Sequence, residues 1–126
     1  MTEIIIIRHG ETEWNKTGRF QGHSDVPLSA EGRAQAEALG RHLALDHVDA
    51  IYASDLIRTM ETAAPLAKRL GLTVVPDPAL RELHFGAWEG RFFSEINTED
   101  PETLKHFYRD PEHVVPREKF FLIVPD

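Results

Sequence analysis

The chain contains no cysteine among its 126 residues. This absence excludes disulfide bonds and thiolate metal sites. The sequence also lacks an apolar run long enough to span a bilayer, and its first residues do not have the pattern of a secretory signal peptide. We therefore expect a cytoplasmic protein that has no membrane partner.

Basic residues are scarce relative to acidic ones. Lys and Arg total 14 against 21 Asp and Glu, which gives a formal net charge of −7. Such a chain does not attract phosphate esters or nucleic acids at long range, and the sequence has no basic patch that would do so locally. We expect no nucleic-acid partner, and any anion site must be built from a few cations at short range.

Strand and helix signals alternate along the chain. Residues 4–7 are four isoleucines, which predict a short strand buried on both faces. Further strands are expected at residues 50–53, 73–75 and 120–124. The alternation predicts one domain over residues 1–126, an α/β fold of three layers (α/β/α) with a mainly parallel sheet.

The helices are expected between these strands. One begins after an N-cap at Ser29 and runs to about residue 44, and another extends from a cap at Asp55 to residue 70. Pro65 lies inside the second helix and should kink or split it. A third helix is expected from Asp100, an N-cap followed by proline, to about residue 109.

The isoleucine run is followed directly by a guanidinium, an imidazole and a glycine, in the segment Arg8-His9-Gly10. Ligands bind outside the carboxyl ends of the strands in open parallel sheets, so a guanidinium and an imidazole at this position indicate an anion site. A loop of about residues 11–27 follows, and loops of that length inside compact domains are usually functional.

Four ordered motifs extend this observation. The first runs from Arg8 to Gly22, the second is Pro27-Leu28-Ser29-Ala30-Glu31-Gly32, and the third is Ala53-Ser54-Asp55-Leu56-Ile57-Arg58-Thr59. The fourth reads Leu80-Arg81-Glu82-Leu83 and continues through Phe85-Gly86-Ala87-Trp88-Glu89-Gly90. Together they resemble the histidine phosphatase (phosphoglycerate mutase-like) superfamily over about the first 110 residues. The fourth motif resembles the branch of broad phosphatases and α-ribazole phosphatase.

The resemblance implies a phosphohistidine intermediate on His9. An imidazole is nucleophilic at neutral pH, and the ring nitrogen that does not attack should donate a hydrogen bond, to a backbone carbonyl. Arg8 and Arg58 follow successive predicted strands and are expected to clamp the phosphate, because a guanidinium binds phosphate oxygens in a bidentate manner.

The acid and the remaining phosphate contacts also follow from the resemblance. Glu82 is the expected general acid, and two effects on it oppose each other: burial beside apolar residues raises a carboxyl pKa, whereas nearby arginines lower it. Asn15, Gln21 and Gly22 are expected to help hold the phosphate, through amide donors and a close backbone approach. For Asn15, capping of the loop is the alternative role.

No cofactor or metal is expected, because the other histidines share no ligand spacing with carboxylates. The substrate class that the resemblance implies is a small phosphorylated metabolite, hydrolysed at a phosphomonoester bond. Phosphoglycerate mutase-type phosphoryl transfer is the alternative reaction. The paired arginines that hold a second charge in mutases have no visible counterpart after Gly90.

The sequence departs from the family after about Pro111, so residues 112–126 are divergent and the resemblance implies a fold truncated at the C-terminus. Family members continue to a second catalytic histidine, which follows a further strand. His113 comes before the next predicted strand and so does not match that position. A catalytically impaired phosphate-binding remnant is therefore a further alternative. The strand at 120–124 is expected at a sheet edge, in its own subunit or in a partner's, which would give a homodimer.

Overall fold

A four-stranded mixed sheet forms the centre of the computed structural model, which describes residues 2–45, 47–109 and 119–124. The strands are β1 (Glu3–Arg8), β2 (Ala50–Ala53), β3 (Val74–Pro76) and β4 (Lys119–Val124), in the spatial order β1-β4-β2-β3. The helices are α1 (Glu13–Thr17), α2 (Ala30–His42), α3 (Ile57–Leu70), α4 (Phe93–Glu99) and α5 (Pro101–Arg109). The predicted α/β class is confirmed.

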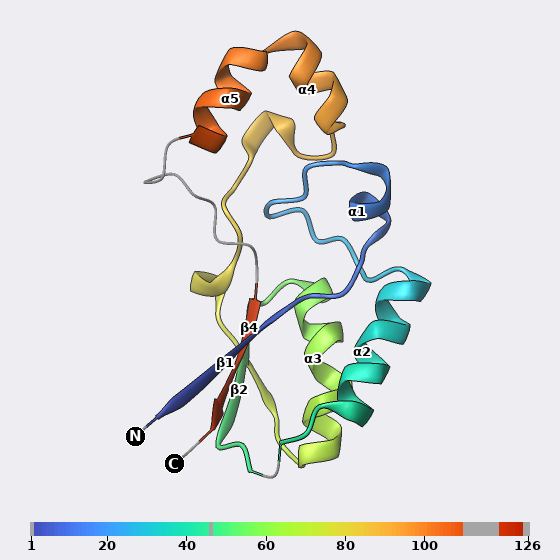
Figure 1. The fold of residues 1–126 in the computed structure, drawn as a ribbon, viewed down its shortest axis with the longest axis vertical. Helices are drawn as coiled ribbons and strands as arrows, with labels where there is room; N and C mark the ends of the chain where they lie inside the picture. Colours follow the sequence, from blue (N-terminus) through green and yellow to red (C-terminus); the bar gives the residue numbers. More distant parts are fainter. Residues whose placement is uncertain (1, 46, 110–118, 125–126) are drawn as a thin grey trace.

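The C-terminal strand occupies the inside of the sheet, in its own chain, so the prediction that it lies at an edge is wrong (Figure 1). It pairs antiparallel with both neighbours, Leu122 being opposite Ile5 of β1 and Ile51 of β2. The strands β1 and β2 therefore run in the same direction without touching, and β2 pairs parallel with β3. A central strand satisfies its backbone donors and acceptors on both sides, which an edge strand cannot do.

The isoleucine strand packs on the core through one face only, and that face is partly buried, which corrects the prediction that both faces are buried. Ile5 and Ile7 pack on the main core cluster, whereas Ile4 and Ile6 are 59% and 52% exposed. The reason is that α3 packs on one face of the sheet with α2 beside it, and no helix of the described residues covers the exposed side of β1. Homodimer formation through this edge stays a prediction.

Small residues cap the helix α2 and allow it to pack closely on α3. Ser29 caps α2 as predicted, its Oγ accepting a hydrogen bond from the backbone N–H of Gly32 at 3.0 Å. Pro65 does not split α3, which continues from Ile57 to Leu70. A Cβ on Gly40 of α2 would lie 2.9 Å from the Cβ of Pro65, so the two helices approach closely at this point.

The helices α4 and α5 lie above the sheet (Figure 1), and each contributes a buried side chain to a second core cluster that is rich in aromatic residues. Phe20 contacts Phe85 and Trp88 at ring-centroid distances of 5.1 and 5.3 Å, and Ile96 and Leu104 bury their side chains in the same cluster. The helix α5 begins at Pro101 as predicted, whereas the short α1 inside the long loop was not predicted. None of the helices in the described ranges is both long and apolar enough to cross a membrane.

One ion pair fixes the segment that precedes the fourth motif. Asp55, in the turn that follows β2, accepts hydrogen bonds from Nε and Nη2 of Arg81, both at 2.5 Å. Because the carboxylate is engaged in this way, it does not cap α3; Leu56 occupies the N-cap position without a side-chain hydrogen bond. The prediction that Asp55 caps this helix is therefore wrong, and its role is to hold residue 81 against the end of β2.

This pair should make the stability of the fold depend on acid pH. The hydrogen bonds from Arg81 lower the pKa of Asp55 from its ordinary value, so the pair stabilises the fold above that value and the gain is lost as the pH falls through the lowered pKa. Asp55→Asn should reduce the unfolding free energy at pH 7 by about 1 kcal/mol. Chemical denaturation at several pH values should show this difference shrinking as the pH falls below about 4.

The control is Glu37→Gln on the exposed face of α2, which should change little at any of these pH values. A difference between wild type and Asp55→Asn that stays constant down to pH 2.5 would contradict the role given to the ion pair.

Candidate active site

His9 follows β1, and a backbone carbonyl engages its Nδ1. It is 8% exposed, and its Nδ1 lies 2.6 Å from the carbonyl oxygen of Gly10. A carbonyl oxygen only accepts, so Nδ1 carries the hydrogen and the neutral ring has its lone pair on Nε2. This confirms the expected hydrogen bond to a backbone carbonyl.

The backbone around Gly10 is fixed by its neighbours on two helices. Its N–H donates to Oγ1 of Thr62 at 2.9 Å, and that hydroxyl in turn donates to the carbonyl of Arg58 at 2.6 Å. A Cβ at Gly10 would lie 2.8 Å from the carbonyl oxygen of Gly32 in the first turn of α2. A residue with a side chain would push the strand end away from this helix, and the imidazole with it.

A cleft of about 340 Å³ opens beside His9. Five of the residues that the sequence singled out line it together: Arg8, His9, Asn15, Gln21 and Glu82. They come from the end of β1, from α1 and its following loop, and from the segment after β3. The structure therefore brings one guanidinium, one imidazole, two amides and one carboxyl group to a common space.

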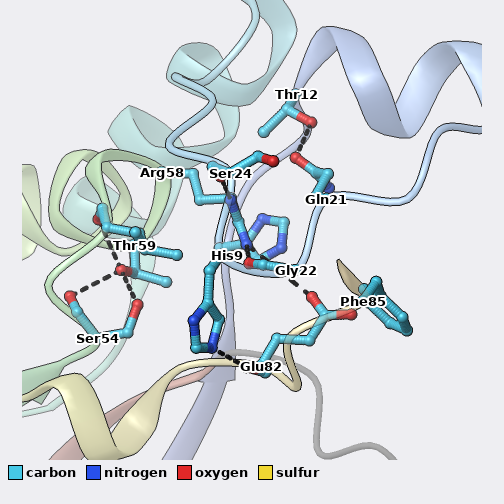
Figure 2. Close-up of polar contacts among 12 residues, drawn as sticks. His9, Thr12, Gln21, Gly22, Ser24, Ser54, Arg58, Thr59, Glu82 and Phe85 are labelled. Atoms are coloured by element: carbon cyan, nitrogen blue, oxygen red, sulfur yellow. Dashed lines mark hydrogen bonds and ion pairs between the residues drawn. The ribbon is translucent and has the colours of Figure 1, made fainter. Parts of the chain in front are cut away.

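Arg58 and Gly22 do not line this cleft, and Figure 2 shows them side by side. The Arg58 side chain is fully buried, and its two terminal nitrogens donate to the carbonyls of Gly22 and Ser24, both at 2.6 Å. Nη2 also lies 4.0 Å from a carboxylate oxygen of Glu82. Arg58 thus connects the loop at residues 22–24 to Glu82, and direct binding of phosphate by Arg58 stays a prediction.

Glu82 is held in position from both sides. Its side chain is 16% exposed, and its backbone carbonyl accepts a hydrogen bond from Nε2 of His23 at 2.9 Å. The preceding residue, Arg81, is bound to Asp55. The sequence left open whether burial or arginines dominate around Glu82; the structure places it in partial burial, facing the guanidinium of Arg58.

Glu89 organises the same loop, and sequence reasoning did not single it out as a functional residue. Its carboxylate accepts hydrogen bonds from the N–H of His23 at 2.8 Å, from Oγ of Ser24 at 2.7 Å and from the N–H of Phe85 at 3.3 Å. Burial disfavours the charged form, but these hydrogen bonds outweigh it and lower the pKa of Glu89.

The carboxylate of Glu89 also explains the glycine at position 22. Gly22 has φ +56°, in the left-handed region, and a Cβ there would overlap a carboxylate oxygen of Glu89 and lie 2.9 Å from the ring of Phe85. In the sequence, the contact between Gly22 and Glu89 is marked only by two glycine-containing segments, Gln21-Gly22 and Glu89-Gly90, and by the spacing between them. That spacing alone does not reveal that they meet.

Thr12 is a second residue that the sequence did not single out. Its side chain is fully buried, and its Oγ1 donates to Oε1 of Gln21 at 2.6 Å (Figure 2). Asn15 caps α1 together with Thr12, since Oδ1 of Asn15 accepts from the backbone N–H of Thr12 at 2.9 Å. The capping alternative for Asn15 is therefore confirmed, while the residue also lines the cleft.

Part of the lining of the cleft is aromatic. It is formed by four side chains, from Trp14, Phe20, Phe85 and Phe93. Arg19 lies beside them, its Nη1 donating to the carbonyl of Gly90 at 2.7 Å and its guanidinium stacking 4.0 Å from the ring centroid of Phe92. The cleft is thus lined by polar groups, which include Arg19, and by an aromatic wall made of these four rings.

No group of three or more His, Asp or Glu side chains in the described residues is arranged to hold a metal ion. The described part of the site offers instead an imidazole lone pair, the Arg8 cation and a carboxyl group. These are the groups that a nucleophilic substitution at an anionic centre requires.

Comparison with known proteins agrees with this geometry. The family profile described as "Histidine phosphatase superfamily (branch 1)" matches residues 4–120. Phosphoserine phosphatase 1 of Hydrogenobacter thermophilus is 37% identical over 114 residues, covering 90% of this chain and 54% of that protein. A phosphoglycerate mutase-like protein 4 of Arabidopsis thaliana is 41% identical, covering 83% of this chain and 46% of that protein.

Solved structures give the same result. YhfR of Bacillus stearothermophilus superposes with a TM-score of 0.79 at 38% identity, over 94% of this chain and 58% of that one. Mycobacterial glucosyl-3-phosphoglycerate phosphatase in complex with VO3 gives 0.79 at 37% identity, over 86% and 54%. The chain spans about half the length of the relatives it matches. Because the family profile matches residues 4–120 and the fold and motifs agree with it, the chain belongs to the histidine phosphatase superfamily.

Proposed function

We propose that this protein hydrolyses small phosphomonoesters through a phosphohistidine intermediate on His9. The observation that carries the proposal is the hydrogen bond between Nδ1 of His9 and the carbonyl of Gly10 at 2.6 Å. It keeps the lone pair on Nε2, the nitrogen that must attack phosphorus, and fixes the plane of the ring. A nucleophile that is already oriented does not lose conformational entropy in the attack.

In the first step, Nε2 of His9 forms a bond to phosphorus while the bond from phosphorus to the ester oxygen breaks. The carboxyl group of Glu82 gives its proton to that oxygen, and an alcohol leaves. In the second step, a water oxygen bonds to phosphorus and the phosphorus–nitrogen bond breaks. The carboxylate of Glu82 takes the proton of this water, and inorganic phosphate leaves.

The polar side of the cleft supports binding of the phosphoryl group. Arg8 contributes a permanent positive charge, and Asn15 and Gln21 contribute amide groups beside it. The buried Arg58 supports the step indirectly, since it holds residues 22–24 and faces the carboxyl group of Glu82. Charge that develops on the phosphoryl oxygens would thus meet fixed donors rather than mobile water.

Two groups of relatives suggest different reactions. Some are named phosphatases, acting on phosphoserine or on glucosyl-3-phosphoglycerate, and others are named probable phosphoglycerate mutases. A mutase must hold a second anionic group near the first. Arg91, the cation that follows Gly90, is engaged with Glu95 and Glu99 at 3.1 and 2.6 Å, which favours hydrolysis over transfer to a bound acceptor.

The aromatic wall supports a preference among phosphomonoesters. Four rings line the cleft together with the polar groups, so the alcohol part of the substrate can rest against apolar surface. A cleft of about 340 Å³ accommodates a small leaving group. We infer that compact substrates with an apolar or ring-containing alcohol are hydrolysed in preference to highly polar ones.

Replacement of His9 by alanine should abolish the intermediate. Turnover of p-nitrophenyl phosphate should fall by at least about 10³-fold, because the nucleophile is lost. Rapid acid-free quenching after brief exposure to labelled substrate should trap an acid-labile phosphoenzyme in the wild type and none in His9→Ala. His42→Ala, an exposed histidine of α2, is the matched control and should behave as the wild type.

Equal background turnover in the wild type and His9→Ala, with no trapped phosphoenzyme, would contradict hydrolysis. It would support the alternative of a phosphate-binding protein with an impaired site. Transfer of the label to an added phosphoglycerate, faster than its release as inorganic phosphate, would support the mutase alternative.

Removal of one ring from the aromatic wall should change substrate preference. Phe93 begins α4, lines the cleft and is 43% exposed, so Phe93→Ala should fold normally. We expect kcat/KM for 1-naphthyl phosphate to fall by about 5- to 10-fold, with less than about a 2-fold change for glycerol 3-phosphate. Ile57→Ala, also an exposed apolar residue but outside the cleft, is the control. Equal losses on the two substrates would contradict contact between the wall and the alcohol.

A further inference from the structure

We propose that Thr12 is a positioning residue, which determines which end of the Gln21 side-chain amide faces the cleft. The inference rests on the proposed phosphate-binding function of that cleft. It concerns a residue that lines neither the cleft nor the neighbouring 270 Å³ pocket beside Gln35, and that acts only through Gln21.

The hydroxyl group of Thr12 is fully committed inside the protein. The residue has no exposed surface, and its Oγ1 accepts a hydrogen bond from the backbone N–H of Asn15 at 3.1 Å. Its hydrogen has two oxygen atoms within reach, Oε1 of Gln21 at 2.6 Å and Oδ1 of Asn15 at 3.1 Å. A hydroxyl has one hydrogen, and the shorter contact, to Gln21, is the one that it makes best.

The bond to Oε1 decides the orientation of the whole amide. The two ends of a glutamine amide have nearly the same shape, so packing does not distinguish them and hydrogen bonding does. Gln21 is 6% exposed and lines the cleft, so it cannot turn freely toward solvent. With Oε1 held by Thr12, the –NH2 end is the one that a ligand in the cleft can meet.

This polarity matters for an anion. The oxygens of a bound phosphate accept hydrogen bonds, so the –NH2 end of Gln21 attracts them, whereas a reversed amide would present carbonyl lone pairs and repel them. Replacement of Thr12 by an apolar side chain removes the group that distinguishes the two orientations. It also leaves a buried Oε1 without its donor, which favours rotation of the amide.

Asn15 provides an internal comparison. Its Oδ1 accepts from the backbone N–H of Thr12 at 2.9 Å, and this donor is present whatever side chain stands at position 12. A change at Thr12 should therefore disturb Gln21 while leaving the amide of Asn15 with its main-chain partner. The effect of Thr12 on anion binding should pass through Gln21.

Thr12 is also the N-cap of α1, so a purely structural role has to be distinguished from positioning. Loss of the cap would destabilise α1 without any dependence on the residue at position 21. A positioning role predicts the opposite: once Gln21 is absent, the side chain at position 12 should no longer affect anion binding.

The experiment is a double-mutant cycle on affinity for inorganic phosphate, measured by isothermal titration calorimetry. Its variants are Thr12→Val, Gln21→Met and the pair, with Thr12→Ser as the conservative rescue. Each single change should weaken phosphate binding by about 10-fold, the double variant should lose no more than either single variant, and Thr12→Ser should stay within about 2-fold of wild type. Thr12→Ala takes the place of Thr12→Val in the cycle if the valine variant does not fold.

A spectroscopic readout accompanies the cycle. The side-chain NH2 resonances of Gln21 should shift on addition of phosphate in the wild type and Thr12→Ser, and should not shift in Thr12→Val. Losses that multiply in the double variant, or wild-type phosphate affinity in Thr12→Val, would overturn the positioning role and leave Thr12 as a helix cap only.

The outcome separates this inference from the proposed function. A wild type that binds phosphate and shows the non-additive cycle, yet hydrolyses no phosphomonoester, would contradict hydrolysis and support the inference. A wild type that hydrolyses p-nitrophenyl phosphate but shows an additive cycle would overturn the inference alone. Absence of phosphate binding by the wild type would overturn it as well.

Discussion

The guanidinium of Arg58 is withdrawn completely from solvent, and the protein compensates its charge with two backbone carbonyls and one carboxylate. An unpaired charge in such a place would cost on the order of several kcal/mol. The loop at residues 22–24 and the segment that carries Glu82 must therefore both reach Arg58 to compensate it. Because Arg58 lies in the first turn of α3, the packing of that helix on the sheet fixes where both segments meet. The geometry of the cleft thus depends on a residue that does not line it.

Two carboxylates lie near this loop, and the structure gives them different tasks. Glu89 accepts hydrogen bonds from three donors of the loop and its own turn, which favour its charged form, and it does not line the cleft. Glu82 does line the cleft, with its backbone held by His23 and its side chain facing Arg58. A carboxylate saturated by structural donors is a poor proton carrier, whereas one that borders a ligand space is available for transfer.

Local patterns in the sequence predicted what depends on neighbours along the chain. The strand ending at Arg8-His9, the cap at Ser29 and the helix that begins at Pro101 follow from residue order alone, and the structure has all three. What the sequence did not reveal arises from pairs far apart in the chain. Arg81 engages Asp55 across 26 positions, Glu89 bonds His23 across 66, and β4 inserts between β1 and β2. Such partners have no periodic or capping signature, because their side chains meet only after the fold has formed.

For the proposed phosphomonoester substrate, the residues that line the cleft favour one direction of binding. The polar groups of the cleft include residues from the end of β1, from α1 and from the segment after β3, while two of its rings, Phe85 and Phe93, contact a third, Phe20. A phosphoryl group beside His9 would meet the cation of Arg8 and the amides of Asn15 and Gln21, whereas an apolar alcohol there would remove water from a cation without replacing its hydrogen bonds. The favoured pose puts phosphorus next to His9 and the alcohol against the aromatic wall. That pose points the leaving oxygen across the cleft, toward the side on which Glu82 and Phe85 lie together.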